Sequence, residues 1–130
     1  MTPDAATAKA WADLQGQIVQ DRARYDWAAK HPALDGVGDA LRHIGRVAAY
    51  GDMLDEMDRL LREISMAPTR WRWDEFRRAI KRDRDLYYEQ ATGHGDLSGH
   101  EAQEERAYGR VLAYDEVLAA MDRTEQESGR

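Results

Sequence analysis

Residues 106–123 read RAYGRVLAYDEVLAAMDR, and ten of these eighteen positions carry the same residue in the earlier stretch RHIGRVAAYGDMLDEMDR, residues 42–59. The similarity continues upstream at an offset of 62 residues. There Trp11, Leu14, Ile18, Asp21, Arg22 and Tyr25 align with Trp73, Phe76, Ile80, Asp83, Arg84 and Tyr87. Such self-similarity indicates a repeated structural element, so the chain is interpreted as two tandem repeat units, residues 1–66 and 67–130.

Each repeat unit has the pattern of two helices. Apolar residues recur at helical spacing and no strand alternation is visible, as in Trp11, Leu14, Ile18 and Tyr25. Pro32 and Pro68 interrupt the pattern, because a proline disfavours helical geometry in the residue before it. Gly93 is expected to end the third helix in the left-handed conformation. The stretch SGHE, residues 98–101, has the pattern of a capping box that starts the fourth helix.

A single helical hairpin buries only one side of each helix, so each repeat unit needs the other as its packing partner. We therefore predict one all-α domain, residues 1–130, built as a four-helix bundle. The bundle would consist of two tandem, internally duplicated helical hairpins related by a pseudo-two-fold axis. Gly45 and Gly109 lie inside predicted helices, where glycine costs about 1 kcal/mol relative to alanine. Their recurrence indicates either close approach of a second neighbouring helix or a slip in helical phase.

The composition favours a globular protein, with 42% hydrophobic and 34% charged residues. No apolar run is long enough to span a membrane and no signal peptide is visible, so a cytoplasmic location is expected. The absence of cysteine excludes disulfides and thiol chemistry. A net charge of −6 argues against binding nucleic acid over the whole surface. The excess of arginine over lysine is typical of a GC-rich bacterial or phage genome.

One candidate site occurs in both repeat units. It groups an aspartate, an arginine and a tyrosine: Asp21, Arg22 and Tyr25 in the first unit, and Asp83, Arg84 and Tyr87 in the second. Such groups could bind an anion or transfer a proton. They could equally form a structural ion pair with a tyrosine hydroxyl at the edge of the core. The structural interpretation is favoured, because two symmetric copies of a polar network suit the register of a bundle.

The stretch TRWRWDEFRRAIKRDRD, residues 69–85, is the main basic cluster, with seven Lys or Arg against four Asp or Glu. Its outer face is expected to carry Trp71, Arg78, Lys81 and Arg82, which are partner-binding candidates together with Trp27. The expected partner is another protein, and nucleic acid is the less favoured choice. The alternative is a solvated helix face, with Asp74 and Asp85 paired to Arg78 and Lys81 at a spacing of four residues.

Metal and cofactor sites have little support in the sequence. Weak metal candidates are His94, His100 and Glu104, and no cofactor is expected. Two acidic clusters invite a further hypothesis of a metal site, namely Asp52, Asp55 and Glu56 with Glu101, Glu104 and Glu105. The first three are expected to point away from the apolar stripe of their helix, whereas a buried metal site would need them to point inward.

We therefore expect a small helical-bundle protein that acts as a protein-interaction or regulatory module without catalysis. The alternatives are a metal-dependent all-α nucleotide hydrolase that uses the acidic clusters, and a nucleic-acid-associated regulator that uses the basic face of the third helix.

Overall fold

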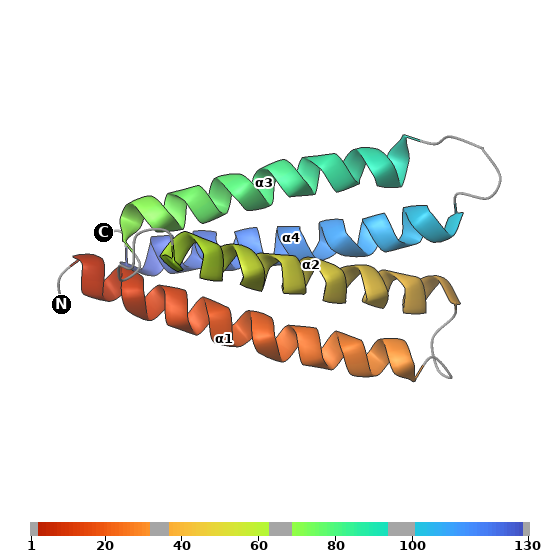
Figure 1. The fold of residues 1–130 in the computed structure, drawn as a ribbon, viewed down its shortest axis with the longest axis horizontal. Coiled ribbons are helices and arrows are strands. Elements are labelled where there is room, and N and C mark those ends of the chain that lie inside the picture. Colours follow the sequence, from red (N-terminus) through yellow and green to blue (C-terminus); the bar gives the residue numbers. More distant parts are fainter. Residues whose placement is uncertain (1–2, 32–36, 63–68, 94–100, 129–130) are drawn as a thin grey trace.

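The computed structural model describes residues 3–31, 37–62, 69–93 and 101–128, and these ranges hold four α-helices and no strand. The helices are α1 (Pro3–Lys30), α2 (Val37–Arg62), α3 (Arg70–Thr92) and α4 (Glu101–Ser128). They lie along one long axis and alternate in direction, so that α2 and α4 run parallel to each other (Figure 1). The prediction of an all-α four-helix bundle is confirmed.

The ends of α3 illustrate how local sequence sets helix boundaries. Thr69 is the N-cap, and its hydroxyl oxygen accepts a hydrogen bond from the Arg72 amide at 3.3 Å. Gly93 follows the last helical residue with φ −87° and ψ −5°, so the expected left-handed conformation is wrong. Its amide donates to the Glu89 carbonyl oxygen at 2.7 Å, and this bond of helical spacing keeps the backbone right-handed. The expected capping box, residues 98–101, lies largely outside the described residues.

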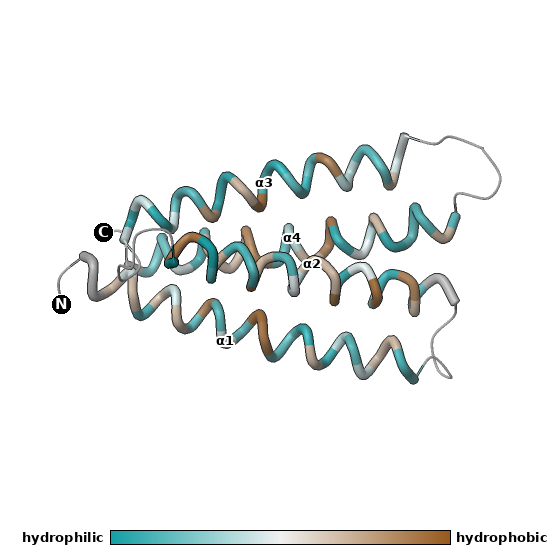
Figure 2. The backbone as a smooth tube through the Cα atoms, viewed as in Figure 1, coloured by the Kyte–Doolittle hydropathy of each residue, from teal (hydrophilic) through white to brown (hydrophobic). Residues whose placement is uncertain are grey.

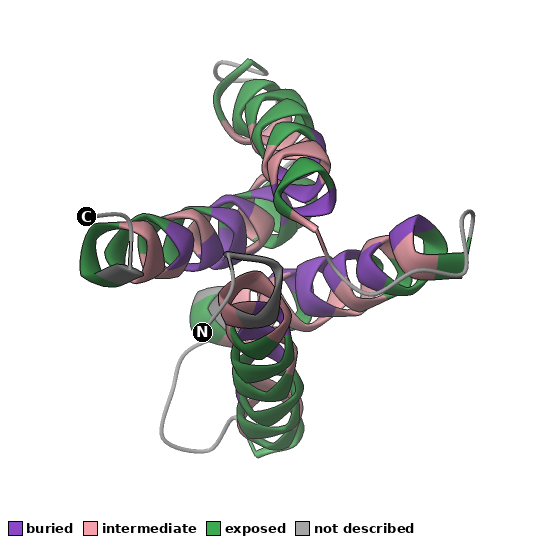
Figure 3. Cartoon of the chain, turned by 90° about the vertical axis from the view of Figure 1, so that its left-hand side faces the viewer, coloured by how far each residue is buried: buried purple, intermediate pink, exposed green. Residues whose placement is uncertain are grey.

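Viewed along its length, the bundle has α2 and α4 on opposite sides of a centre and α1 and α3 on the two remaining sides (Figure 3). The closest packing joins α2 to α4, while α1 packs mainly on α2 and α3 mainly on α4. Hydrophobic positions recur along each helix rather than gathering in one segment (Figure 2). The largest fully buried side chains are Trp11, Ile18, Tyr50, Met57, Phe76, Ile80, Tyr114 and Met121.

The two buried helical glycines lie where α2 and α4 approach each other. A Cβ atom at Gly45 would collide with the backbone carbonyl of Arg106, and one at Gly109 would collide with that of Arg42. Glycine therefore allows the two helix backbones to touch at this level of the bundle. The sequence left two explanations open for these glycines, a second neighbouring helix or a slip in helical phase. The structure supports the first, because α2 contacts two neighbours, α1 and α4.

Candidate functional site

A polar network around Arg46 joins three helices. The Arg46 guanidinium donates hydrogen bonds to Glu116 of α4 at 2.7 Å and to the Tyr50 hydroxyl at 3.1 Å. The Tyr50 hydroxyl in turn donates to Glu116 at 3.0 Å. Arg46 also lies over the ring of Tyr25 from α1, 4.4 Å from the ring centroid. The network thus connects α2 to both α1 and α4.

A matching network surrounds Arg110 of α4. Its guanidinium donates to Asp52 of α2 at 2.8 Å and to the Tyr114 hydroxyl at 3.5 Å. It lies over the ring of Tyr87 from α3, 4.3 Å from the ring centroid. Positions 64 residues apart on α2 and α4 therefore make corresponding contacts. A pseudo-two-fold arrangement would produce this correspondence, and the duplication itself stays our interpretation of the sequence.

The chemistry of these two networks suits helix packing. Burial raises the pKa of the Tyr50 and Tyr114 hydroxyls far above the ordinary value of 10, and the charge of Glu116 adds to the effect on Tyr50. Both tyrosines therefore stay protonated, and each guanidinium already faces a carboxylate. Neither network therefore contains an unpaired cation that could bind an anion, or a hydroxyl that would ionise near neutral pH.

The grouping of aspartate, arginine and tyrosine expected from the sequence does not assemble as one site. In the first unit Asp21 is buried and Arg22 is exposed, while the Tyr25 ring contacts Arg46 instead. In the second unit Arg84 pairs with Asp115 of α4 at 2.9 Å. The two tyrosines join the central networks and Asp21 neighbours Glu116, whereas Arg22 and Arg84 point elsewhere, because neighbouring positions on a helix point about 100° apart.

A groove of about 510 Å³ runs between α1 and α4. Small and branched apolar side chains form much of its lining: Ala6, Ala10, Leu14 and Ile18 from α1, and Val117 and Ala120 from α4. It extends from Glu127, near the end of α4, to Asp21 and Glu116 at the middle of the bundle. The direct contact between these two helices is sparse, which leaves this space open along their length.

Asp21 is the buried acidic residue of this groove. Only 6% of Asp21 is exposed, and its carboxylate accepts one hydrogen bond, from the Gln17 side-chain amide at 3.0 Å. Burial raises the pKa of Asp21 above the ordinary 3.8, and the neighbouring charge of Glu116 raises it further. The charge of Arg24 offsets part of this increase in pKa, but the described part of the chain contains no cation within ion-pair distance of Asp21. The groove therefore ends at a carboxylate whose charge no contacting cation balances.

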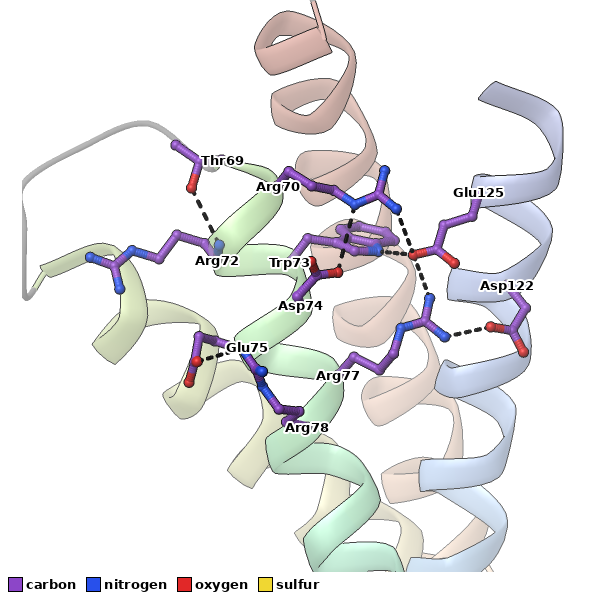
Figure 4. Close-up of polar contacts among 10 residues, drawn as sticks. All are labelled: Thr69, Arg70, Arg72, Trp73, Asp74, Glu75, Arg77, Arg78, Asp122 and Glu125. Atoms are coloured by element: carbon purple, nitrogen blue, oxygen red, sulfur yellow. Dashed lines mark hydrogen bonds and ion pairs between the residues drawn. The ribbon is translucent and has the colours of Figure 1, made fainter. Parts of the chain in front are cut away.

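The two repeat units differ at the residues that open this groove. At an offset of 62 residues the small side chain of Ala10 is replaced by Arg72, and at an offset of 64 Ala120 corresponds to Glu56. The Arg72 side chain is buried, with 3% exposed, and points from α3 toward the neighbouring end of α2 (Figure 4). The positions that the two repeat units share did not indicate the groove, whereas these departures from the repeat are a signal of it in the sequence.

The two tryptophans predicted to lie on outer faces are exposed. Trp71 is 53% exposed, and the guanidinium of Arg72 lies 4.4 Å from its ring centroid. Trp27 is 63% exposed and stacks on His31, with the ring centroids 4.1 Å apart. They lie near opposite ends of the bundle, since Trp71 begins α3 and Trp27 falls in the last turns of α1. They do not form one aromatic surface.

The basic outer face of α3 is partly neutralised by its own acidic residues. Arg78 pairs with Glu75 at 2.6 Å, and Arg82 approaches Asp83 at 3.7 Å. Lys81 is exposed, and the described ranges contain no ion-pair partner for it. The face is therefore a mixed row of charges in which one lysine stays unbalanced.

The ion pairs that the sequence suggested for this face use other partners. Asp74 pairs with Arg70 at 3.6 Å rather than with Arg78 (Figure 4). Asp85 pairs with Arg84 at 3.4 Å rather than with Lys81. Spacing alone did not select the partner, because several acidic residues lie within reach of each cation on a highly charged helix.

The candidate metal residues are not assembled among the described residues. His94 and His100 lie outside the described ranges, and within those ranges no three His, Asp or Glu side chains form a group that could hold a metal ion. The acidic clusters of α2 and α4 are also apart. Because Gly45 meets Arg106, the two clusters are separated by at least roughly 12 Å along the parallel helices.

Fold and site together define the class of this protein: a four-helix bundle with an open groove between α1 and α4, whose lining includes four carboxylates and two cations. Comparison with protein-family models, with curated proteins and with solved structures finds no match. Over the described ranges, none of the helices combines the length and the apolar character needed to cross a membrane.

Proposed function

We propose that this chain is a non-catalytic protein-interaction module that holds a segment of another protein in the groove between α1 and α4. The observation that carries the proposal is the groove itself, about 510 Å³ in volume and bounded by two long helices. This volume lies within the range of pockets that bind ligands. The groove is elongated, because its lining on α1 runs from Ala6 to Asp21. This shape favours an extended or helical peptide over a compact small molecule.

The lining supports a peptide as the occupant. Its walls combine small apolar side chains with polar groups at intervals, as peptide grooves do when apolar contacts supply affinity and polar contacts fix the register. Catalysis has less support, because the Arg46 and Arg110 networks are internally satisfied and keep their tyrosines protonated. The principal binding surface is therefore the groove, and not the outer faces of α1 and α3 that carry Trp27 and Trp71.

The test uses the second repeat unit as a guide to close the groove. The variant A10R/A120E places an arginine and a glutamate in the groove, the same residue types that stand at the corresponding positions Arg72 and Glu56. The matched control A12R/A119E makes the same two changes at exposed alanines of α1 and α4 that do not line the groove. Far-UV circular dichroism and thermal unfolding establish that both variants are folded.

A random peptide library is then selected on the unmodified protein, and each enriched peptide is measured against both variants. We expect peptides that bind the unmodified protein and A12R/A119E equally and lose at least about tenfold in affinity for A10R/A120E, equivalent to about 1.4 kcal/mol. Equal binding to the two variants, or a failure to enrich any peptide, would show that the groove is not a docking site.

A further inference from the structure

Two carboxylates, those of Asp21 and Glu116, lie at the inner end of the groove. Glu116 is neutralised by Arg46, which it contacts at 2.7 Å, whereas Asp21 has no contacting cation among the described residues. A buried carboxylate without a cation destabilises a fold, since desolvation is not offset by an opposite charge. A ligand that brings one positive charge to Asp21 would remove this cost.

The second repeat unit does not share this imbalance. The residue that corresponds to Asp21 is Asp83, and Arg82 lies 3.7 Å from it. The residue before Asp21 is Gln20, which is uncharged. The first unit thus lacks the arginine that precedes the aspartate in the second unit, whereas Arg22 follows Asp21 just as Arg84 follows Asp83. It also lacks Arg72, because Ala10 stands at the corresponding position, about 16 Å from Asp21 along α1.

We propose that Asp21, at the end of the α1/α4 groove, binds an arginine side chain of the partner segment. This inference rests on the proposed function and names the chemistry of the partner. The long apolar stem of an arginine can lie against Ile18 and Val117 of the lining, and its planar guanidinium can donate to a carboxylate through two nitrogens. The second unit already buries such a side chain, that of Arg72, between its own helices.

Lysine and metal ions fit this position less well. An ammonium group is more strongly hydrated and makes no planar double contact with a carboxylate, so it gains less in a half-apolar groove. A divalent cation needs several oxygen ligands, and the described residues provide no group of three acidic or histidine side chains for it. The geometry therefore selects a single guanidinium.

The first experiment titrates the full chain with N-acetyl-arginine amide and follows backbone amide signals by two-dimensional NMR. The neutral isostere N-acetyl-citrulline amide and the lysine analogue are the matched ligands. We expect saturable shifts at residues around Asp21 and Glu116, with a dissociation constant of about 1 mM for the arginine compound and at least about tenfold weaker binding of the other two.

Two aspartate variants of α1 make the titration specific. Asp21→Asn should weaken binding of the arginine compound at least about tenfold. Asp26→Asn is the control, because Asp26 pairs with Lys30 at 2.9 Å and does not line the groove. Equal affinity for the citrulline compound, an unchanged affinity in Asp21→Asn, or no saturable shift at about 10 mM would overturn the arginine assignment.

The selected peptides separate this inference from the proposed function. Each groove-dependent peptide is resynthesised with citrulline in place of arginine, and a loss of binding supports recognition by Asp21. Unchanged binding of the citrulline peptides overturns the arginine assignment and leaves the groove as a docking site. If no peptide depends on the groove, the proposed function fails, and the titration with N-acetyl-arginine amide alone decides whether Asp21 binds a guanidinium.

Discussion

Substituting the crossing glycines tests the packing of α2 against α4 directly. In Gly45→Ala the new Cβ atom would lie about 2.8 Å from the carbonyl carbon of Arg106, and in Gly109→Ala about 2.7 Å from that of Arg42. These are backbone atoms, which cannot rotate away as a side chain can. Each substitution therefore forces the two helices apart at their closest approach.

The expected magnitude follows from two opposing contributions. Overpacking in a well-packed interior costs about 1–3 kcal/mol, whereas replacing a helical glycine by alanine stabilises a helix by about 1 kcal/mol. The rigid backbone contact places the first contribution near its upper end, so each variant should lose about 1–2 kcal/mol. In the double variant the second substitution should cost less than the first, because the helices have already separated at the shared crossing.

Gly16 provides the matched control within the same fold. It lies inside α1, and a Cβ atom there would have no neighbour within 4 Å. Gly16→Ala should therefore stabilise the protein by about 1 kcal/mol. Urea unfolding followed by far-UV circular dichroism measures all of these variants. Stabilisation of Gly45→Ala or Gly109→Ala to the same extent as Gly16→Ala would refute the close-crossing argument.

Two further substitutions test the buried polar groups. Burial and the charge of Glu116 raise the pKa of Asp21 above 3.8, so the ionised carboxylate lowers the stability of the folded protein at neutral pH. Asp21→Asn should therefore raise the melting temperature at pH 7. The difference in melting temperature between the two proteins should vanish below pH 3.8, where the Asp21 carboxyl is protonated in the folded and in the unfolded state. An equal difference at both pH values would contradict this. Tyr50→Phe should lose about 1–2 kcal/mol, because the Tyr50 hydroxyl donates to Glu116 at 3.0 Å. Tyr114→Phe should lose less, because the Tyr114 hydroxyl accepts from Arg110 at 3.5 Å and donates to no carboxylate among the described residues. Chemical denaturation measures both, and equal losses would show that the carboxylate contact contributes nothing.

The fold was predictable because its determinants are local and repeated. The apolar spacing of residues such as Trp11 and Ile18 defines helices without knowledge of their partners, and both side chains lie in the core. The prolines and Thr69 mark boundaries for the same reason, since capping and backbone geometry depend on a few adjacent residues. Gly45 and Gly109 indicated a close contact, but only the structure identifies which helix they meet.

The partners in the polar networks were not predictable from the sequence. Arg46 and Glu116 are seventy positions apart, and their contact depends on the crossing of α2 and α4. Helical periodicity gives the direction of a side chain on its own helix, but the level and rotation of the neighbour come from packing. The sequence therefore identified Tyr25 and Tyr87 as recurring polar positions and assigned them to the wrong arginines.

The groove could not be predicted from the positions that the two repeat units share. Shared positions such as Trp11 and Trp73 maintain the common core, so they carry information mainly about the fold. The informative positions are instead those where one unit departs from the other. Two such departures line the groove, Ala10 for Arg72 and Ala120 for Glu56, and a third, Gln20 for Arg82, directly precedes its buried aspartate. The first two reduce side-chain volume along the groove, and the third removes a cation beside the buried aspartate. Their convergence on one side of an otherwise matched bundle is the reason to place binding at Asp21 rather than on the exposed tryptophans.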